Sequence, residues 1–342
     1  MEAQLLLPAY AGFNLYAVDS KLFRKMKMRV TLLSGDAGSV LKTLPSESVD
    51  CVVTSPPYWA LRDYGVSGQL GVEPDFRGYL RNLCRVFDEV KRVLKKEGTC
   101  WVNLGDTYCG NKAGKTDNKV CDYLKKTSKK INKTKDPVIK EKSLLQIPSR
   151  FAIEMTNRGW ILRNEIIWYK PNAMPSSVKD RFTADYEKLF FFTKAKKYYF
   201  EQQFEPLSEA SLKDLFGSKS FRNKGSNNAY VCPGEGRDRR EFYNPRGRNK
   251  RCVWTIPTKP YKGAHFAPFP LDLAVIPIRA GCPNGGIVLD PFIGSGTTAI
   301  AALINGCDCV GIDVNQKYLD IARERIFNET GVNCTNERLD GH

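Results

Sequence analysis

The chain has 342 residues, and its 53 Lys and Arg against 37 Asp and Glu give a formal net charge of +16. This charge predicts a polyanionic partner, because clustered Lys and Arg gain by releasing that partner's counterions. With no apolar stretch of about 18 residues and no signal peptide, we expect a soluble cytoplasmic protein without a membrane partner. Eleven scattered cysteines without a Cys-x-x-Cys pair, and only two histidines, argue against a metal site.

The chain opens with an arm and two strand-like segments. Residues 1–29 form the N-terminal arm, which ends in a basic stretch. Apolar, β-branched runs predict strands at 30–34 and 49–54. We expect each strand to open onto a ligand position, because polar residues follow both.

A helix is predicted between Phe76 and Lys96, where apolar residues recur at helical spacing. We expect Gly98 to end it and residues 100–104 to form the next strand. The apolar residues of the expected buried side are Leu80, Leu83, Cys84, Phe87, Val90, Val93 and Leu94.

Four later apolar runs complete the pattern. They predict strands at 161–169, 188–193, 287–290 and 307–312, which makes seven strands in all. Strands that alternate with helices predict the α/β class, with a doubly wound, mostly parallel sheet. Such a sheet binds its ligands outside the carboxyl ends of its strands.

Two basic stretches interrupt this pattern. Residues 106–146 hold eleven lysines against five acids and few large apolar groups, which predicts a mobile surface insert. It either contacts phosphates or is only a solvated loop. Residues 201–262 contain a second stretch in which seven Lys and Arg lie among aromatic and Asn residues, between Gly236 and Arg251.

The segment Thr54-Ser55-Pro56-Pro57-Tyr58-Trp59 directly follows the strand predicted at 49–54. Neither proline donates a backbone hydrogen bond, and each fixes its own φ, so the chain leaves the sheet as a stiff loop. The Pro56 carbonyl is then available to a ligand, beside a hydroxyl and an aromatic face. This combination suits a flat base with an amino group, although ordinary turn chemistry is the alternative.

The second motif is Asp290-Pro-Phe-Ile-Gly-Ser-Gly-Thr-Thr298, between a predicted strand and a predicted helix. Its glycines allow a close backbone approach to a ligand at the helix N-terminus. Asp313 ends the following strand, where an acid accepts from two ribose hydroxyls. The pattern is neither the dinucleotide fingerprint nor a phosphate loop, so an adenosine-type ligand without pyrophosphate fits better.

Together these motifs resemble the amino-group DNA methyltransferases that use S-adenosylmethionine, in the subgroup whose catalytic motif precedes the cofactor motif. Further matches are Ser34-Gly35-Asp36, Trp168-Tyr-Lys-Pro-Asn172 with Arg181 and Glu187, and His265-Phe-Ala-Pro-Phe-Pro270. The resemblance implies a Rossmann-like methyltransferase sheet with a basic target-recognition insertion. Because no Pro-Cys pair occurs, it gives no support for cysteine attack at cytosine carbon 5.

The resemblance assigns roles to individual positions. Its catalytic loop falls on Ser55, Pro56, Pro57 and Tyr58. Its cofactor site falls on Asp36, His265, Phe269, Asp290, Pro291, Phe292, Gly294, Ser295, Gly296, Thr297, Thr298 and Asp313. Tyr58 is expected to stack on a base flipped from the duplex, and Trp59 either extends that wall or belongs to the core. The weak nucleophilicity of an amino nitrogen would be raised by hydrogen bonds to Ser55 and the Pro56 carbonyl.

Double-stranded DNA is the partner that charge and resemblance together imply. Arg and Asn pair with guanine and adenine edges, while Lys and Arg also hold phosphates, so we expect a minority of the basic residues to read bases. The expected DNA-binding residues are Lys170, Arg181, Arg237, Arg239, Arg240, Arg246, Arg248, Lys250 and Arg251.

Ser in the first place of the catalytic motif resembles the enzymes that make N4-methylcytosine, whereas Asp or Asn there is usual for N6-methyladenine. We therefore expect N4 of cytosine as the methyl acceptor, with N6 of adenine as the alternative. RNA or protein methyltransferases, and a non-catalytic DNA-binding protein, are rival classes; the last explains the charge but not both motifs.

The expected organisation places the catalytic half of the methyltransferase domain at 30–200, the target-recognition region at 201–262, the cofactor-binding half at 263–330 and a tail at 331–342. Family association adds a partner restriction endonuclease, with the protein a monomer or a homodimer.

Overall fold

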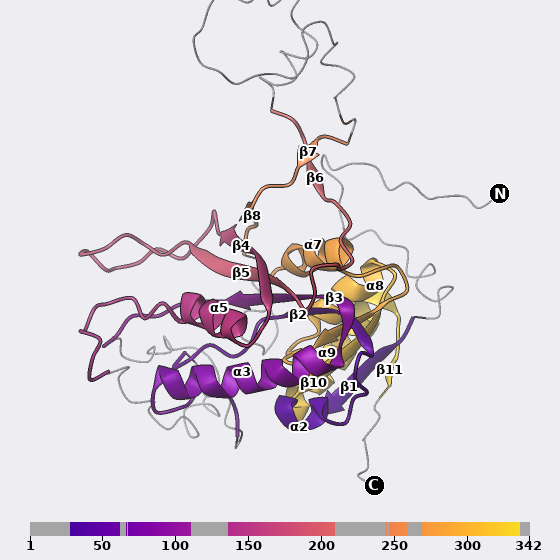
Figure 1. Ribbon diagram of the computed structural model, residues 1–342, viewed down its shortest axis with the longest axis horizontal. Coiled ribbons are helices and arrows are strands. Elements are labelled where there is room, and N and C mark those ends of the chain that lie inside the picture. The colour runs from indigo at the N-terminus through magenta and orange to yellow at the C-terminus, as the bar shows by residue number, and fades with distance from the viewer. Residues whose placement is uncertain are drawn as a thin grey trace, which may run out of the picture. The chain divides into compact units, whose positions relative to one another are not determined.

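The computed structural model describes residues 28–61, 66, 68–110, 136–208, 244, 246–258 and 269–335. The chain divides into two compact units. The larger unit comprises Val18–Glu201 and Cys252–His342, and the smaller includes Gln202–Arg251. All of the helices and the large sheet described below lie in the larger unit (Figure 1).

The larger unit is built on a sheet of nine strands in the order β11-β1-β10-β9-β2-β3-β5-β4-β8. Of these, β5 alone runs antiparallel to its neighbours. The α/β class and the mostly parallel sheet are therefore confirmed. The strands are β1 (Val30–Ser34), β2 (Val49–Thr54), β3 (Leu94–Leu104), β4 (Ile161–Tyr169), β5 (Tyr186–Thr193), β8 (Val253–Thr255), β9 (Ile287–Asp290), β10 (Asp308–Asp313) and β11 (Cys334–Thr335).

The expectation of seven strands is wrong by two, both at the edges of the sheet. β8 pairs with β4 over three residues, and β11 pairs with β1 over two. Segments this short show no periodicity in sequence. They form because an edge strand offers unpaired N–H and C=O groups to any chain that passes beside it.

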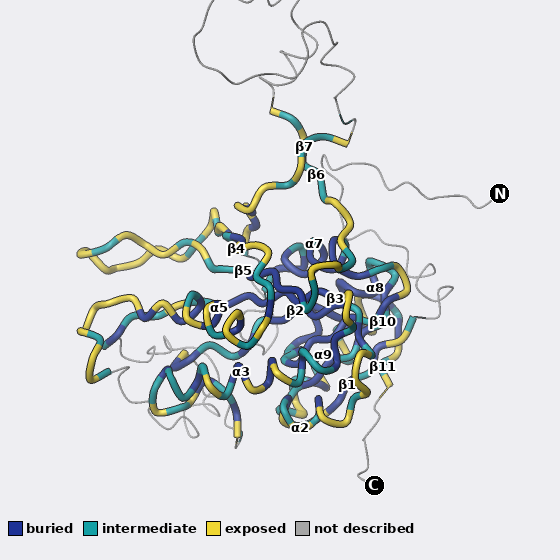
Figure 2. Tube along the Cα trace, in the orientation of Figure 1, coloured by how far each residue is buried: buried dark blue, intermediate teal, exposed yellow. Residues whose placement is uncertain are grey.

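Six helices of the described chain cover the two faces of the sheet. α2, α3 and α5 lie on one face, and α7, α8 and α9 lie on the other (Figure 1). Figure 2 shows the buried residues gathered in the central strands and in the helices packed against them. The sequence pattern indicated α3 and the start of α8 but none of the others. Their bounds are α2 (Ala37–Leu41), α3 (Phe76–Val93), α5 (Ile147–Asn157), α7 (Leu271–Gly281), α8 (Thr297–Ile304) and α9 (Gln316–Thr330).

Helix α3 ends earlier than its sequence predicts. Its predicted buried side is largely observed, but the chain is already extended at Leu94 (φ −68°, ψ 133°), where β3 begins. Gly98 therefore lies inside a strand and does not end the helix. A Cβ atom on Gly98 would come within 2.8 Å of the Asp50 carbonyl oxygen, so glycine is needed for the close approach of β2.

The order of the strands locates the ligand crevice. β2 and β9 are neighbours, and the connections that leave them run toward opposite edges of the sheet. A reversal of this kind opens a crevice at the carboxyl ends of the two strands. The Ser55 loop follows β2 and the Pro291 loop follows β9, so both loops begin at this crevice.

The two ends of the expected surface insert at 106–146 are packed within the larger unit. Tyr108 forms a β-bridge with Leu144, and Cys109 and Leu145 are buried. Apolar side chains bury the two ends of the segment, although its composition as a whole is basic. Residues 111–135 lie outside the described chain.

The smaller unit contributes one described element, a two-stranded antiparallel sheet of β6 (Phe204–Glu205) and β7 (Arg248–Asn249). Most of the predicted target-recognition region lies outside the described residues. Within the part of the chain that is described, no helix combines the length and the apolar character that crossing a membrane requires.

Candidate active site

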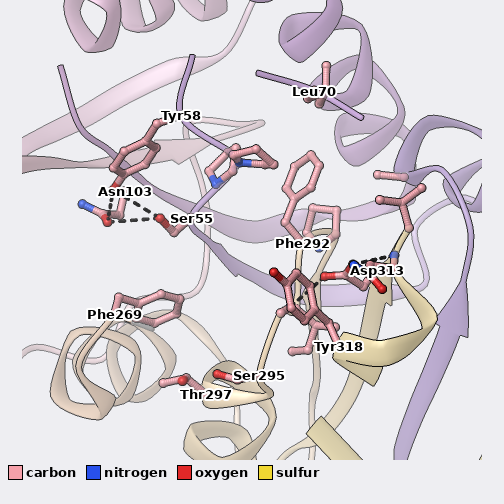
Figure 3. Close-up of a pocket in the computed structure, with 18 of the residues that line it drawn as sticks. Ser55, Tyr58, Leu70, Asn103, Phe269, Phe292, Ser295, Thr297, Asp313 and Tyr318 are labelled. Carbon is pink, nitrogen blue, oxygen red and sulfur yellow. Dashed lines mark hydrogen bonds between the residues drawn. The ribbon is translucent and has the colours of Figure 1, made fainter. Parts of the chain in front are cut away.

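A cavity of about 390 Å³ lies at the carboxyl ends of the parallel strands. Its lining comes from the loops that follow β1, β2, β9 and β10, and from the ends of β3, β4 and β5. Ser55 and Gly294, which are far apart in sequence, line this one cavity. Figure 3 shows Ser55, Tyr58 and Asn103 on one side, and Phe292, Asp313 and Tyr318 on the other.

On the β2 side, three polar side chains form a hydrogen-bonded group. The Tyr58 hydroxyl lies 2.9 Å from Asn103 Oδ1, and Ser55 Oγ lies 3.3 Å from the same oxygen. Asn103 comes from the end of β3 and is buried. The half-buried Ser55 hydroxyl is thus held within the cavity wall.

Glu187 and Lys170 extend this group. The Tyr58 hydroxyl lies 2.6 Å from Glu187 Oε2, and Lys170 Nζ forms an ion pair with Glu187 Oε1. Because a hydroxyl carries one proton, the shorter contact assigns the Tyr58 proton to Glu187. Burial, and then the charge of Glu187, raise the pKa of Tyr58 well above its usual value, so the phenol is neutral.

Tyr58 and Trp59 have different environments. The Tyr58 ring lies so close to Gly105 that a Cβ atom there would meet Tyr58 Cε2 at 2.6 Å. Trp59 is 5% exposed, donates from Nε1 to the Glu73 carbonyl oxygen at 2.9 Å and packs edge-on against Phe76. Trp59 therefore belongs to the core, and Tyr58 is the aromatic side chain of this loop that lines the cavity.

Asp290 lies beneath the cavity and connects its two halves. Its carboxylate accepts from Thr54 Oγ1 and Thr298 Oγ1, each at 2.6 Å, and from the Phe292 N–H at 3.0 Å. The residue is fully buried, and this burial raises its pKa to about 6. Since its oxygens are engaged by protein groups, Asp290 joins the end of β2 to the β9–α8 turn and does not line the cavity.

The turn between β9 and α8 depends on glycine. Gly294 and Gly296 have φ angles of 50° and 85°, in the left-handed region that glycine enters at little cost. From the other side, Arg325 of α9 donates to Ser295 Oγ at 3.1 Å and to Thr297 Oγ1 at 2.9 Å. The turn is therefore fixed by its backbone and by one cation.

Two carboxylates face the β9 side of the cavity. Asp313 accepts from the N–H groups of Gly294 (3.1 Å) and Asn315 (2.8 Å), and its burial raises its pKa to about 6. Asp36 caps α2 by accepting from the Ser39 N–H at 2.9 Å. A carboxylate has about four acceptor sites, so Asp313 keeps capacity for ligand hydroxyls.

The cavity gathers most of the predicted cofactor and catalytic residues. Those that line it are Asp36, Ser55, Pro56, Pro57, Tyr58, Phe269, Pro291, Phe292, Gly294, Ser295, Thr297 and Asp313. Gly296 and Thr298 lie in the turn but, like Asp290, are not among the lining residues. His265 lies outside the described chain.

Several lining residues were missed in the sequence. Asn103, Asn315 and Tyr318 line the cavity, as do Gln69 and Leu70, whereas Trp168 belongs to a segment that the family resemblance had singled out. Asn315 and Tyr318 follow Asp313 so closely in sequence that the predicted strand end at Asp313 could have identified them as site residues. No sequence signal could have identified Asn103, because it comes close to Ser55 only through the pairing of β2 with β3.

The predicted DNA-binding residues are dispersed. Lys170 lies in the cavity wall, where it pairs with Glu187, and the Arg181 guanidinium lies 3.9 Å from the centre of the Tyr108 ring. In the smaller unit Arg248 and Arg251 both contact Glu205, and Arg246 lies over Phe204. Lys250 is half-buried, and this burial lowers its pKa. Arg237, Arg239 and Arg240 lie outside the described chain.

No cluster of His, Cys, Asp and Glu suited to a metal ion occurs among the described residues. The donor set of the cavity instead suits an organic ligand. Aromatic and apolar side chains lie beside a few fixed polar groups, and about 390 Å³ falls within the range of small-molecule sites, roughly 300–1,000 Å³.

Comparisons with known proteins agree with this geometry. The type II methyltransferase M.SmaI from Serratia marcescens is 39% identical over 296 residues, covering 86% of this chain and 90% of that protein. M.Cfr9I from Citrobacter freundii is 41% identical over 302 residues, covering 87% and 88%. A putative DNA modification methylase from Thermus thermophilus, solved with S-adenosyl-L-methionine, shares the fold with a TM-score of 0.56 and 24% identity, covering 91% and 99%.

The DNA methylase family model, which describes N6 and N4 methyltransferases, matches residues 49–324. This range contains the Ser55 loop, the β9–α8 turn and Asp313, which together form the cavity. The chain belongs to this family and is a DNA methyltransferase.

Proposed function

We propose that this DNA methyltransferase uses S-adenosylmethionine to methylate the exocyclic N4 of cytosine in duplex DNA, with the target base flipped into the cavity. The observation that carries the proposal is the single cavity shared by Ser55 and the Gly294 turn. One side offers a hydroxyl and a carbonyl to an amino group, and the other offers acceptors and aromatic faces to an adenosine.

The cofactor side supplies fixed groups for a nucleoside. Asp313 accepts from the ribose hydroxyls, and Phe292 and Tyr318 lie beside it in the lining. Phe269 and Ser295 hold the methionine part. When bound, S-adenosylmethionine supplies an electrophilic methyl group on a sulfonium sulfur.

The target side supplies acceptors for the two amino hydrogens. An amino nitrogen on an aromatic ring is a poor nucleophile, because its lone pair is delocalised into the ring. Ser55 Oγ and the Pro56 carbonyl oxygen each accept one hydrogen bond from the amino group, which favours the pyramidal nitrogen. Transfer would break the sulfur–methyl bond as the nitrogen–methyl bond forms, and the amino group would then lose one proton to solvent. The Pro57 carbonyl is already used by the Tyr79 hydroxyl at 2.8 Å, so Pro56 is the proline that serves the base.

Tyr58 stacks on the flipped base. Its hydroxyl donates to Glu187, and its ring is backed by Gly105, so its orientation is set before the base arrives. Preorganisation of this kind lowers the entropic cost of bringing the reacting atoms together.

The choice of cytosine rests on Ser55, because a Ser in the first place of the catalytic motif resembles the motif of the N4-cytosine enzymes. Methylated DNA digested to nucleosides and analysed by mass spectrometry should contain N4-methylcytosine. N6-methyladenine alone would overturn the choice of base and leave the rest of the proposal intact. Methyl incorporation into RNA or protein in preference to DNA would overturn the substrate class.

Ser55→Ala tests the catalytic role. Removing the hydroxyl should slow single-turnover methyl transfer, while the Kd for S-adenosylmethionine, measured by titration calorimetry, stays within about twofold. A large loss of cofactor affinity would assign Ser55 to the other side of the cavity. Ser46→Ala serves as the matched control, because Ser46 is exposed and does not line the cavity.

Duplex DNA is the partner, and Arg246, Arg248, Lys250 and Arg251 of the smaller unit contact it together with Arg181. The type II relatives suggest a partner restriction endonuclease that cleaves the same sequence when it is unmethylated. Modified-base sequencing of a host chromosome after expression would identify the methylated sequence.

A further inference from the structure

The loop that joins β4 to β5, residues 170–185, carries two large apolar side chains in full contact with solvent. Phe182 is 96% exposed and Met174 is 88% exposed. Figure 2 shows the loop as a mostly exposed projection from the end of these two strands. Single exposed apolar residues are ordinary, but two of this size on one projecting loop suggest a surface that is covered during function.

The base of this loop is fixed. The Lys170 N–H donates to the Asp185 carbonyl oxygen at 2.8 Å and closes the hairpin. The Asn172 side chain donates to the Thr258 carbonyl oxygen at 2.8 Å and accepts from the Thr258 N–H at 2.8 Å. The loop therefore leaves the sheet in a defined direction.

The residues before Phe182 are also held in place. The Arg181 guanidinium lies 3.9 Å from the centre of the Tyr108 ring, and Asp180 forms an ion pair with Lys142 at 2.6 Å. The side chain of Phe182, the next residue, does not pack with these groups and is exposed. An aromatic ring is thus presented on a supported backbone.

The loop continues the wall of the active site. Lys170 at the start of the loop and Glu187 in β5, two residues beyond its end, line the cavity, and Glu187 accepts from the Tyr58 hydroxyl. Phe182 lies three residues from Asp185 at the base of the loop and reaches up to about 10 Å from it, which exceeds the depth of a DNA major groove, about 8.5 Å. A duplex whose target base enters the cavity therefore lies within reach of Phe182.

The charges of the loop fit the same partner. Lys179 and Arg181 lie beside Phe182 in sequence, and Lys142 lies against the loop, while Asp180 and Asp185 are its acids. Asp180 forms an ion pair with Lys142, and Lys170 forms an ion pair with Glu187. The remaining cations of the loop, Lys179 and Arg181, are therefore the ones that meet phosphates.

We propose that Phe182 enters the base stack at the position vacated by the flipped base. This inference rests on the proposed function, because it requires a duplex from which one base has been extruded. Extrusion costs the stacking and pairing of that base, and an inserted apolar side chain restores part of the stacking on its neighbours.

The test compares Phe182→Ala with wild type on two duplex oligonucleotides that carry the methylated sequence once it is mapped. In the first the target base is paired, and in the second it faces an abasic site, so it is already unpaired. On the paired duplex, single-turnover methylation by the variant should fall about tenfold, the order expected for removal of one base–aromatic stack. On the second duplex the two proteins should differ by less than about threefold.

Phe182→Trp keeps an aromatic ring and should retain most of the wild-type rate on the paired duplex. Phe327→Ala, which removes a half-exposed phenyl ring from α9, is the matched control and should not distinguish the duplexes. The affinity for S-adenosylmethionine and the Tm of Phe182→Ala should equal those of wild type.

An equal loss on both duplexes would overturn the inference, because Phe182 would then be a DNA contact or a structural residue. An unchanged rate on the paired duplex would overturn it as well. Failure of the wild-type protein to methylate either duplex would instead refute the proposed function, so the two failures are distinguishable.

Discussion

Asp313 makes cofactor binding depend on pH. Burial raises its pKa to about 6, and its role as an acceptor for ribose hydroxyls requires the ionised form. Affinity for S-adenosylmethionine should therefore be fully present well above pH 6 and be lost as the pH falls through 6. Titration calorimetry between about pH 5 and 8 measures this profile.

The control for this profile is Asp313→Asn, which cannot ionise. Its affinity should be weaker than that of wild type at pH 8 and nearly independent of pH. Asp290 has a similar pKa of about 6, but its oxygens are engaged beneath the cavity. A profile that persists unchanged in Asp313→Asn would therefore assign the titration to Asp290.

Gly105 tests the orientation of Tyr58. A Cβ atom at this position would lie 2.6 Å from Tyr58 Cε2, and the ring cannot easily retreat because its hydroxyl is held by Glu187. Gly105→Ala should therefore slow methyl transfer about tenfold or more, since small misplacements of a reacting group are costly.

The matched control is Gly78→Ala on α3, where the nearest atom to an added Cβ lies at 3.6 Å, an ordinary contact, and which does not line the cavity. Single-turnover rates with saturating cofactor measure both variants, and circular dichroism checks the fold. Equal rates for Gly105→Ala and wild type would show that the position of the Tyr58 ring does not matter for the reaction.

The sequence predicts those site residues that follow directly from a strand end. Ser55 and Asp313 are of this kind, because a motif of known geometry places each at the carboxyl edge of the sheet. Asn103 depends on which strands become neighbours, and a strand pattern does not specify its partner, whereas Glu187 was singled out only through the family resemblance. Lys170 was predicted to bind DNA, and its ion pair with Glu187 could not be predicted, because the two residues meet only when β4 and β5 align.

At the scale of elements, helix α9 supports the cofactor turn through one side chain. Arg325 is 15% exposed and donates to the Ser295 carbonyl oxygen, to Ser295 Oγ and to Thr297 Oγ1, while it pairs with Glu329 on its own helix. The cation thereby fixes two residues that line the cavity.

Arg325→Ala should raise the KM for S-adenosylmethionine about tenfold, the order expected for removing hydrogen bonds from a charged donor, with a smaller change in kcat. Steady-state kinetics with varied cofactor give both constants. Arg323→Ala, which removes an arginine that pairs with Asp320 on the same helix, is the matched control. A fall in kcat at unchanged KM would mean that Arg325 acts on the chemistry and not on the cofactor turn.

The elements that the sequence indicated are one long periodic helix and apolar runs of four or more residues. Helix α3 and strands β1, β2, β9 and β10 are buried along most of their length, and β4 was predicted although most of it is not. β8 and β11 do not, because an edge strand of two or three residues is defined by its neighbour. The junction of α3 with β3 was misjudged because Gly98 is required by its contact with β2, which a local pattern does not reveal.

At the scale of the whole molecule, the net charge of +16 should make the binding of DNA and the binding of the cofactor respond differently to salt. The observed association constant for duplex DNA should fall steeply between about 50 and 200 mM salt, because each phosphate contact releases counterions. Binding of S-adenosylmethionine should change little, since a small ligand carries no condensed counterions to release. Fluorescence anisotropy with labelled duplex and calorimetry with the cofactor measure the two dependences.

The salt dependence of DNA binding also identifies which cations contact the DNA. Replacing Arg246, Arg248 and Arg251 of the smaller unit with alanine should reduce the slope of log K against log salt by up to about 2.7, or about 0.9 for each phosphate that is no longer neutralised. Replacing the exposed Lys42, Lys96 and Lys196 of the larger unit changes the net charge equally and should leave the slope nearly unchanged. Equal effects of the two triple variants would mean that the DNA responds to the total charge, and the basic segment of the smaller unit would lose its role as a defined contact surface.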